Sequence, residues 1–236
     1  MKVQIPEEYQ QNVESYDEYG LSPEQSVTVT SFVNKVYGLM CVALLITAGS
    51  AWWTINALPP EQIARWMFPA MIAEIVLVLA LNFLAHRLPA VVAQLAMIGY
   101  AALNGFTLSI IFLVYTKESL AGAFAVTGGL FGAMSLYGTL TKRDLTTMGS
   151  FCVMALFGLI LAGLVNIFLQ STAMDFVTSC IGVLVFTGLV AYDSQQIKRF
   201  GAAGANGTLA VLAALGLYLD FINLFLYVVR LMGRRK

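Results

Sequence analysis

Three acidic residues stand inside long apolar stretches of this sequence: Glu74, Asp193 and Asp220. A charged side chain at the centre of a bilayer costs roughly 2.5–3.5 kcal/mol on insertion scales, so such residues usually face a bundle interior or a water-filled path. They are therefore candidates for handling a proton or a cation. The structural alternative is a carboxyl that keeps its proton, or pairs with a base, only to fix helix packing.

Asp193 and Asp220 are the most informative of the three, because they fall in consecutive apolar runs. Asp193 lies five residues before Lys198, about 8 Å along a helix, whereas Asp220 lies twelve residues into the next run, about 18 Å. The sequence leaves open whether the two carboxyls lie at the same depth. If they meet, we expect them to titrate as a unit, because two carboxyls in a low-dielectric setting resist double ionisation.

The elements that must position these acids are predicted to be transmembrane helices. Of the 236 residues, 59% are hydrophobic and only 11% are charged, against about 25% charged in a soluble domain. A helix needs about 20 apolar residues to cross the hydrocarbon core, and seven runs qualify, near 34–56, 66–85, 91–115, 119–140, 149–169, 175–197 and 208–230. The predicted fold is an all-α bundle of seven transmembrane helices, antiparallel in sequence order because the connecting loops are short.

The amino-terminal segment has a different composition. Six acidic residues fall in the first 24 positions, and no basic stretch followed by an apolar one marks a signal peptide. We predict an acidic, flexible cytoplasmic tail over residues 1–31 and a transmembrane domain over 32–236. The formal net charge is zero, so no basic excess points to nucleic acid.

Basic residues indicate the orientation of the helices. Outside the carboxyl-terminal tail, seven fall on the side of the amino terminus and two on the other, which predicts a cytoplasmic amino terminus. The tail itself carries four more, Arg230, Arg234, Arg235 and Lys236. With seven crossings the tail lies outside, against the rule, whereas a re-entrant last run would return it to the inside.

Small residues and possible metal ligands complete the pattern. Gly128 and Gly132 form a G-x-x-x-G, and the fifth run carries Gly158 and Gly163; small residues of this kind let helices pack closely. The single histidine, His86, and three separated cysteines fit no metal motif. We therefore expect no cofactor and no resident metal site.

Several segments together resemble the Bax inhibitor-1 family, also called the transmembrane Bax inhibitor motif family. The resemblance spans residues 36–235, is closest to bacterial inner-membrane members, and is strongest over 108–115, 131–138, 141–145, 186–193 and 217–225. It implies a multi-pass protein of a bacterial inner membrane, with seven helices of which the last is central.

The resemblance also implies a function and a site. Family members act as calcium leak channels that respond to pH, and an aspartate pair on the sixth and seventh helices is the proposed sensor and gate. Asp193 and Asp220 match that pair and would bind calcium transiently. Arg87 is the candidate for an accessory arginine of the second helix, and Glu74 for an acidic residue near the pore. The expected partners are calcium and the lipid bilayer, and no enzymatic activity is implied.

Two other functions stay open from the sequence. Some bacterial members of the family are linked to a membrane-bound quality-control protease, which could engage the acidic tail of this chain, while eukaryotic members suppress cell death. An aspartate pair on adjacent helices is also typical of intramembrane aspartyl proteases, and Tyr192-Asp193 fits that pattern. The second motif of those enzymes is Gly-x-Gly-Asp, however, and here residues 217–220 read Leu-Tyr-Leu-Asp.

Overall fold

The computed structural model describes residues 23–84, 88–205, 207–234 and 236. Most of the predicted tail, His86 and Arg87 lie outside the described residues. Within them the chain forms seven helices, each long and apolar enough to cross a membrane. They are α2 (Pro23–Ala57), α3 (Pro60–Leu84), α4 (Ala90–Val114), α5 (Lys117–Leu140), α6 (Thr146–Leu169), α7 (Thr172–Ala202) and α8 (Gly207–Met232). The predicted all-α bundle of seven spans is confirmed.

The first helix begins earlier than its apolar run. Helix α2 includes residues 23–31, which are predicted from their composition to belong to the tail. Val29 and Phe32 are buried, and Gly201 near the end of α7 lies against both, since a Cβ built on it would sit 3.1 Å from the Cα of Val29. Packing between distant segments thus orders a polar stretch that local composition assigns to a tail.

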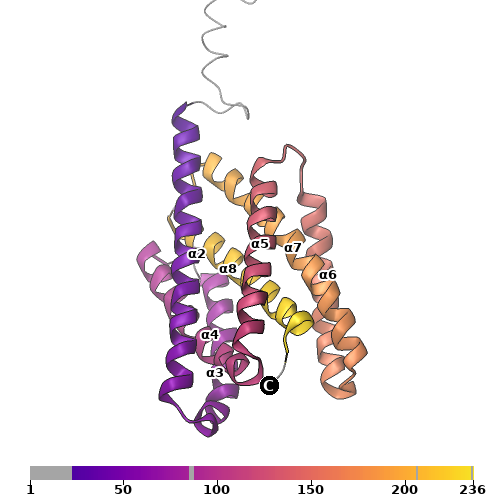
Figure 1. The fold of residues 1–236 in the computed structure, drawn as a ribbon. Coiled ribbons are helices and arrows are strands. Elements are labelled where there is room, and N and C mark those ends of the chain that lie inside the picture. The colour runs from indigo at the N-terminus through magenta and orange to yellow at the C-terminus, as the bar shows by residue number, and fades with distance from the viewer. Residues whose placement is uncertain (1–22, 85–87, 206, 235) are drawn as a thin grey trace, which may run out of the picture.

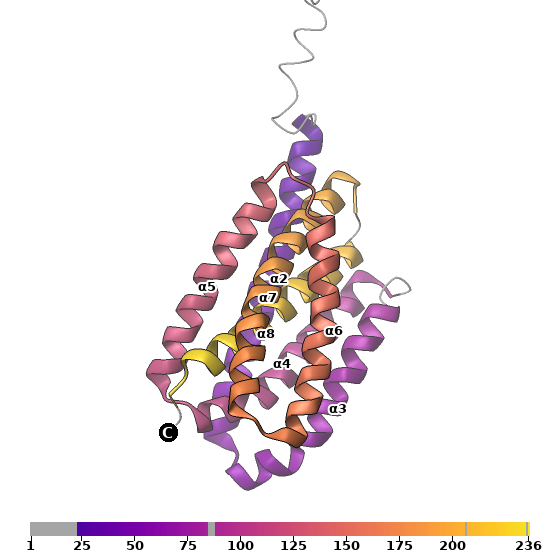
Figure 2. The same ribbon diagram turned by 90° about the vertical axis from the view of Figure 1, so that its right-hand side faces the viewer.

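Helix α8 is the centre of the bundle, as predicted. In the most apolar stretch of α8, 56% of the residues are buried, against 11% in the corresponding stretches of α3 and of α6. Figures 1 and 2 show α8 running obliquely through the bundle, and it packs against α2, α4, α5 and α7. The outer faces carry large exposed hydrophobic side chains, such as Phe157, Leu161 and Phe168 on α6. Such a surface suits lipid rather than water.

The two ends of the bundle are distinguished by the chain termini. The N-side is defined here as the end at which α2 begins, and the C-side as the opposite end, where the chain terminates (Figure 1). The tail is fastened to the α4–α5 loop on the C-side: the amide of Thr116 donates to the carbonyl of Arg234 (3.1 Å), and the amide of Lys236 donates to that of Val114 (2.9 Å). This arrangement fits a last helix that crosses rather than one that returns.

The close helix contacts use other glycines than those predicted. Around Gly128, Gly132, Gly158 and Gly163 an added Cβ would meet nothing within 4 Å, so the prediction that they pack closely is wrong. The tight approaches involve a different set, in which an added Cβ would collide with a neighbouring helix: Gly105 with α2, Gly138 and Gly149 with α7, Gly182 with α8 and Gly188 with α6. A spacing of four places two glycines on one face, but it does not say whether that face points inward.

Candidate functional site

The carboxyls of Asp193 on α7 and Asp220 on α8 lie close enough to share a hydrogen bond. A carboxylate only accepts hydrogen bonds, so such a bond requires a proton on one of the two groups. Asp193 is partly buried and Asp220 is 7% exposed. The structure thus answers the question of depth that the sequence leaves open.

The length of α7 explains part of the match in depth. The helix continues to Ala202 instead of ending near Lys198, which places Asp193 about 14 Å from its end, against about 20 Å for Asp220 from the start of α8. Gly216 lies one turn before Asp220 on the same face of α8. An added Cβ at Gly216 would sit 3.3 Å from the Oδ2 atom of Asp193, so the missing side chain makes room for that carboxyl.

A cleft leads to the pair between the end of α7 and the beginning of α8, on the N-side. Its volume is about 230 Å³. Asp193, Tyr192 and Gln196 line it from α7, and Gly216 lines it from α8. The amide of Gln196 donates to the hydroxyl of Tyr192 (2.8 Å). Asp193 therefore lies at the wall of a cleft, while Asp220 lies behind it.

One carboxyl oxygen of Asp220 has no hydrogen-bond donor among the described residues. Its buried Oδ2 atom accepts no hydrogen bond from a backbone, hydroxyl, amide or basic group within the described residues. Buried polar atoms in folded proteins nearly always have such a partner. The partner of this carboxyl is the other aspartate, which can donate only while the pair holds a proton. No group of three or more metal-binding side chains occurs in the described ranges.

Three hydroxyl groups next to the pair join three helices. Tyr37 of α2 donates to Ser194 of α7 (3.0 Å), Ser194 donates to Ser135 of α5 (3.1 Å), and Tyr37 also bonds Ser135. Ser194 follows Asp193 directly, so this cluster holds the Asp193 segment against α2 and α5. Sequence reasoning missed these residues. The signal in the sequence that could have found them is the presence of three hydroxyl-bearing residues within apolar runs.

Glu74 belongs to a second polar network, on the opposite side of α8. It accepts a hydrogen bond from Thr107 (2.6 Å) and lies near the Asn104 side chain. Asn104 accepts from the hydroxyl of Tyr218 (2.9 Å), which in turn bonds Thr47 (2.7 Å). Within the described part of the chain Glu74 contacts neither aspartate, so the structure does not bring this candidate to the pair. Arg87, the other accessory candidate, lies outside the described residues.

A third polar cluster closes the N-side of α7. Arg199 forms an ion pair with Asp144 in the α5–α6 loop (2.7 Å), and Gln195 donates to the carbonyl of Arg143 (2.7 Å) and accepts from the amide of Leu145 (2.9 Å). Hydrogen bonds from Thr146, and then from Arg199, lower the pKa of Asp144 to about 2. Asp144 is therefore ionised throughout the physiological pH range, and its contacts in this loop do not change over that range.

Comparisons with known proteins agree on one family. A family model described as "Inhibitor of apoptosis-promoting Bax1" matches residues 29–236. The inner membrane protein YbhL of Escherichia coli (strain K12) is 43% identical over 216 residues, which cover 87% of this chain and 92% of that protein. An uncharacterized protein of Deinococcus radiodurans is 39% identical over 229 residues, covering 94% and 99% of the two chains.

Proposed function

This chain is a multi-pass membrane protein of the Bax inhibitor-1 family, and we propose that it is a pH-sensitive, calcium-permeable leak channel. The gate is the contact between Asp193 and Asp220. The observation that carries the proposal is the close approach of these two carboxyls at the inner end of a cleft. Their contact joins α7 to the central helix, so a change in their protonation acts on the middle of the bundle.

The proton content of the pair sets the strength of this contact. With one shared proton the carboxyls form a charge-assisted hydrogen bond, which is roughly twice as strong as a neutral one. Without a proton two carboxylates repel each other, and α7 separates from α8. With two protons the charge assistance is lost. Cys152 of α6 is a further titratable group near Asp220.

Calcium suits the chemistry of these residues. It binds carboxylate, carbonyl and water oxygens in flexible geometries, and a leak path needs only weak binding so that the ion can leave again. Asp193 lines the cleft and meets an ion first. Asp220 becomes available when the two carboxyls part.

The orientation of the channel follows from the basic residues. We place the amino terminus, and with it the N-side cleft, in the cytoplasm, because the loops of that end hold most of the basic residues outside the tail. The pair then responds to cytoplasmic pH. Reporter fusions at each terminus test this placement, and a carboxyl terminus accessible from the cytoplasm would contradict it.

The proposed activity is tested with the purified full-length chain in vesicles that contain no other protein. Entry of calcium is followed with an enclosed fluorescent indicator from pH 6 to 8. We expect flux above that of protein-free vesicles, with a minimum where the pair holds one proton and an increase where it holds none. Flux equal to that of empty vesicles at every pH would overturn the proposal.

We further infer that the chain is not an enzyme. A pair of aspartates would suit proteolysis, but Leu217 and Leu219 stand where intramembrane aspartyl proteases have glycines before the second aspartate. Cleavage of a reporter substrate by the purified protein, abolished by Asp220→Asn, would contradict this inference.

A further inference from the structure

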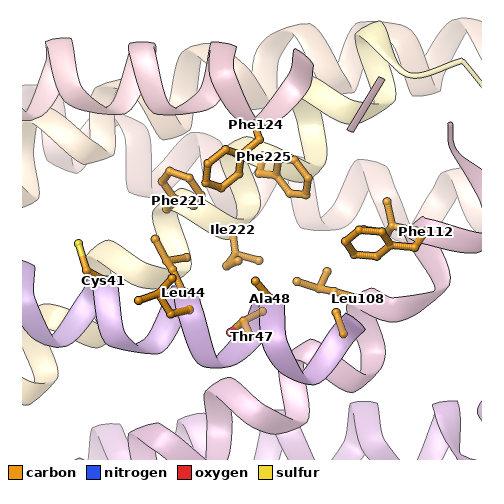
Figure 3. A pocket seen from close by; sticks show the side chains of 13 residues that line it. Cys41, Leu44, Thr47, Ala48, Leu108, Phe112, Phe124, Phe221, Ile222 and Phe225 are labelled. Carbon is orange, nitrogen blue, oxygen red and sulfur yellow. The ribbon is translucent and has the colours of Figure 1, made fainter. Parts of the chain in front are cut away.

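A second cavity opens on the side of the bundle, between α2 and α5. Figure 3 shows the aromatic rings of Phe124, Phe221 and Phe225 on one side of it and Thr47 and Ala48 of α2 on the other. Its volume is about 370 Å³, within the range of roughly 300–1,000 Å³ that is typical of ligand pockets. We call this cavity the lateral crevice.

The crevice opens toward the face that meets lipid. Leu45 and Phe124, which line it from α2 and α5, are 72% and 55% exposed, as expected for side chains at a rim. The floor is formed by α8 through Phe221, Ile222 and Phe225. A molecule in the crevice therefore enters from the bilayer and lies against the central helix.

The walls of the crevice are apolar and suit a hydrocarbon chain. Its lining side chains are apolar except for the hydroxyl of Thr47 and the thiol of Cys41. The hydroxyl of Thr47 is already engaged with the carbonyls of Ala43 and Ala101 and with Tyr218. Water would gain few hydrogen bonds there. Lipid chains are as apolar as these walls, so an occupant gains from close packing rather than from leaving water.

The C-side end of the crevice carries positive charge. The ammonium group of Lys236 donates to the carbonyl of Phe112 (2.7 Å), and Phe112 is one of the lining residues. Lys117 and Arg234 are exposed at the same end, together with one acid, Glu118. The amide of Arg234 is fixed to the hydroxyl of Ser119 (3.0 Å), so the basic tail is held beside the beginning of α5. This charge suits an anionic group at the membrane surface.

We propose that the lateral crevice binds one acyl chain of an anionic phospholipid, whose headgroup lies against Lys117, Arg234 and Lys236. The acyl chain supports the floor of the crevice from the side opposite to the bundle interior. That floor is part of the turn of α8 that directly follows Asp220. The binding site itself stands independently of channel activity.

The site is tested by photocrosslinking in vesicles with the full-length protein. The probe is a phosphatidylglycerol with a diazirine near the end of one acyl chain, and the crosslinked residues are identified by mass spectrometry. We expect crosslinks concentrated within 41–51 and 221–225, in excess over the lipid-exposed residues Phe157 and Leu161 of α6. Equal labelling of the crevice and of α6 would mean ordinary surrounding lipid and would overturn the proposal.

A blocking variant and a matched control sharpen this test. Ala48→Trp fills the crevice, whereas Leu164→Trp adds the same ring to the outer face of α6, where Leu164 is 52% exposed. Crevice labelling should fall to the level seen on α6 in Ala48→Trp and stay unchanged in Leu164→Trp. Full labelling in a folded Ala48→Trp protein would contradict the proposal, and the wild-type labelling pattern decides the matter if that variant does not fold.

The headgroup and a competing occupant are distinguished in the same vesicles. Lys236→Gln should weaken retention of phosphatidylglycerol relative to phosphatidylcholine about fivefold, the ratio that corresponds to about 1 kcal/mol per basic residue near anionic lipid. An unchanged preference would overturn the headgroup assignment.

Cys41 lines the crevice, so oxidation of a Cys152→Ser, Cys180→Ser protein tests whether a second copy of this protein occupies it. A disulfide-linked dimer through Cys41 would assign the crevice to that copy instead.

Discussion

Tyr218 and Asp220 stand two residues apart on α8, and both are buried polar groups, with exposures of 0% and 7%. They face different helices and are satisfied in different ways. Tyr218 bonds Thr47 of α2 and Asn104 of α4, neither of which titrates. Asp220 bonds Asp193 of α7, and that bond exists only while a proton is present.

The difference separates a fixed face of the central helix from a releasable one. Satisfied buried networks rigidify a core, whereas a network that depends on one proton changes when the proton leaves. The bonds of Tyr218 on α8 to α2 and α4 use a hydroxyl and an amide, whereas we propose that the contact of α8 with α7 depends on pH. The proposed opening is a separation of α7 from α8, with the Tyr218 side unchanged.

The largest loss of stability is expected where α2 and α4, the two helices that hold the fixed face of α8, pack against each other. Gly105 of α4 has no room for a side chain, because an added Cβ would sit 2.6 Å from the Cβ of Ser50 on α2 and closer still to the carbonyl of Thr47. Gly105→Ala should destabilise the protein by about 1–3 kcal/mol, as overpacking generally does. Thermal unfolding in detergent measures the change.

The matched control for that variant lies on the same helix. An added Cβ at Gly99 would meet nothing within 4 Å, so Gly99→Ala should leave stability unchanged or raise it by up to about 1 kcal/mol through helix propensity. Equal effects at Gly99 and Gly105 would show that α2 and α4 do not approach each other as described.

A smaller loss is expected on removing the hydroxyl of Tyr218. Tyr218→Phe deletes the bonds to Thr47 and Asn104, and such bonds between transmembrane helices contribute about 0.6 kcal/mol each. Stability should fall by about 1 kcal/mol, while the pH profile of calcium flux keeps its shape. Tyr137→Phe, on the exposed face of α5, is the control. A lost pH profile in Tyr218→Phe would remove the distinction between the two faces.

The smallest effect is expected at Asp144, whose ion pair with Arg199 is exposed. Its pKa is lowered from 3.8 to about 2 in the folded protein, so its contribution to stability is complete above pH 3.8 and is lost as the pH falls toward 2. Asp144→Asn should lower the unfolding midpoint slightly and equally from pH 5 to 8. A pH profile of flux that changes in this variant would place a sensor in the α5–α6 loop.

The seven spans could be predicted because length and hydropathy decide which segments cross a membrane. The aspartate pair could be predicted because an acid within an apolar run is costly and needs a reason. The relative depth of Asp193 and Asp220 could not, since it depends on the end of α7 at Ala202 and on the oblique path of α8. Both features are set by packing between helices.

The hydroxyl networks could not be read from the sequence, for a related reason. A hydroxyl in a helix can bond the carbonyl four residues before it, as Thr127 does with Ala123, and then it needs no other partner. Thr47 makes the same local bond with Ala43 and yet also reaches Tyr218 on α8. Residue type does not distinguish the two cases; only the orientation of the helix does.

The most direct test of the central claim is calcium flux through a double variant, Asp193→Asn with Asp220→Asn, in vesicles from pH 6 to 8. The amides keep the size of the carboxyls and their ability to hydrogen-bond, but they do not titrate. We expect a folded protein whose flux is nearly constant over this range, whereas the flux of the unaltered protein varies. A folded double variant that retains the original pH profile would contradict the account.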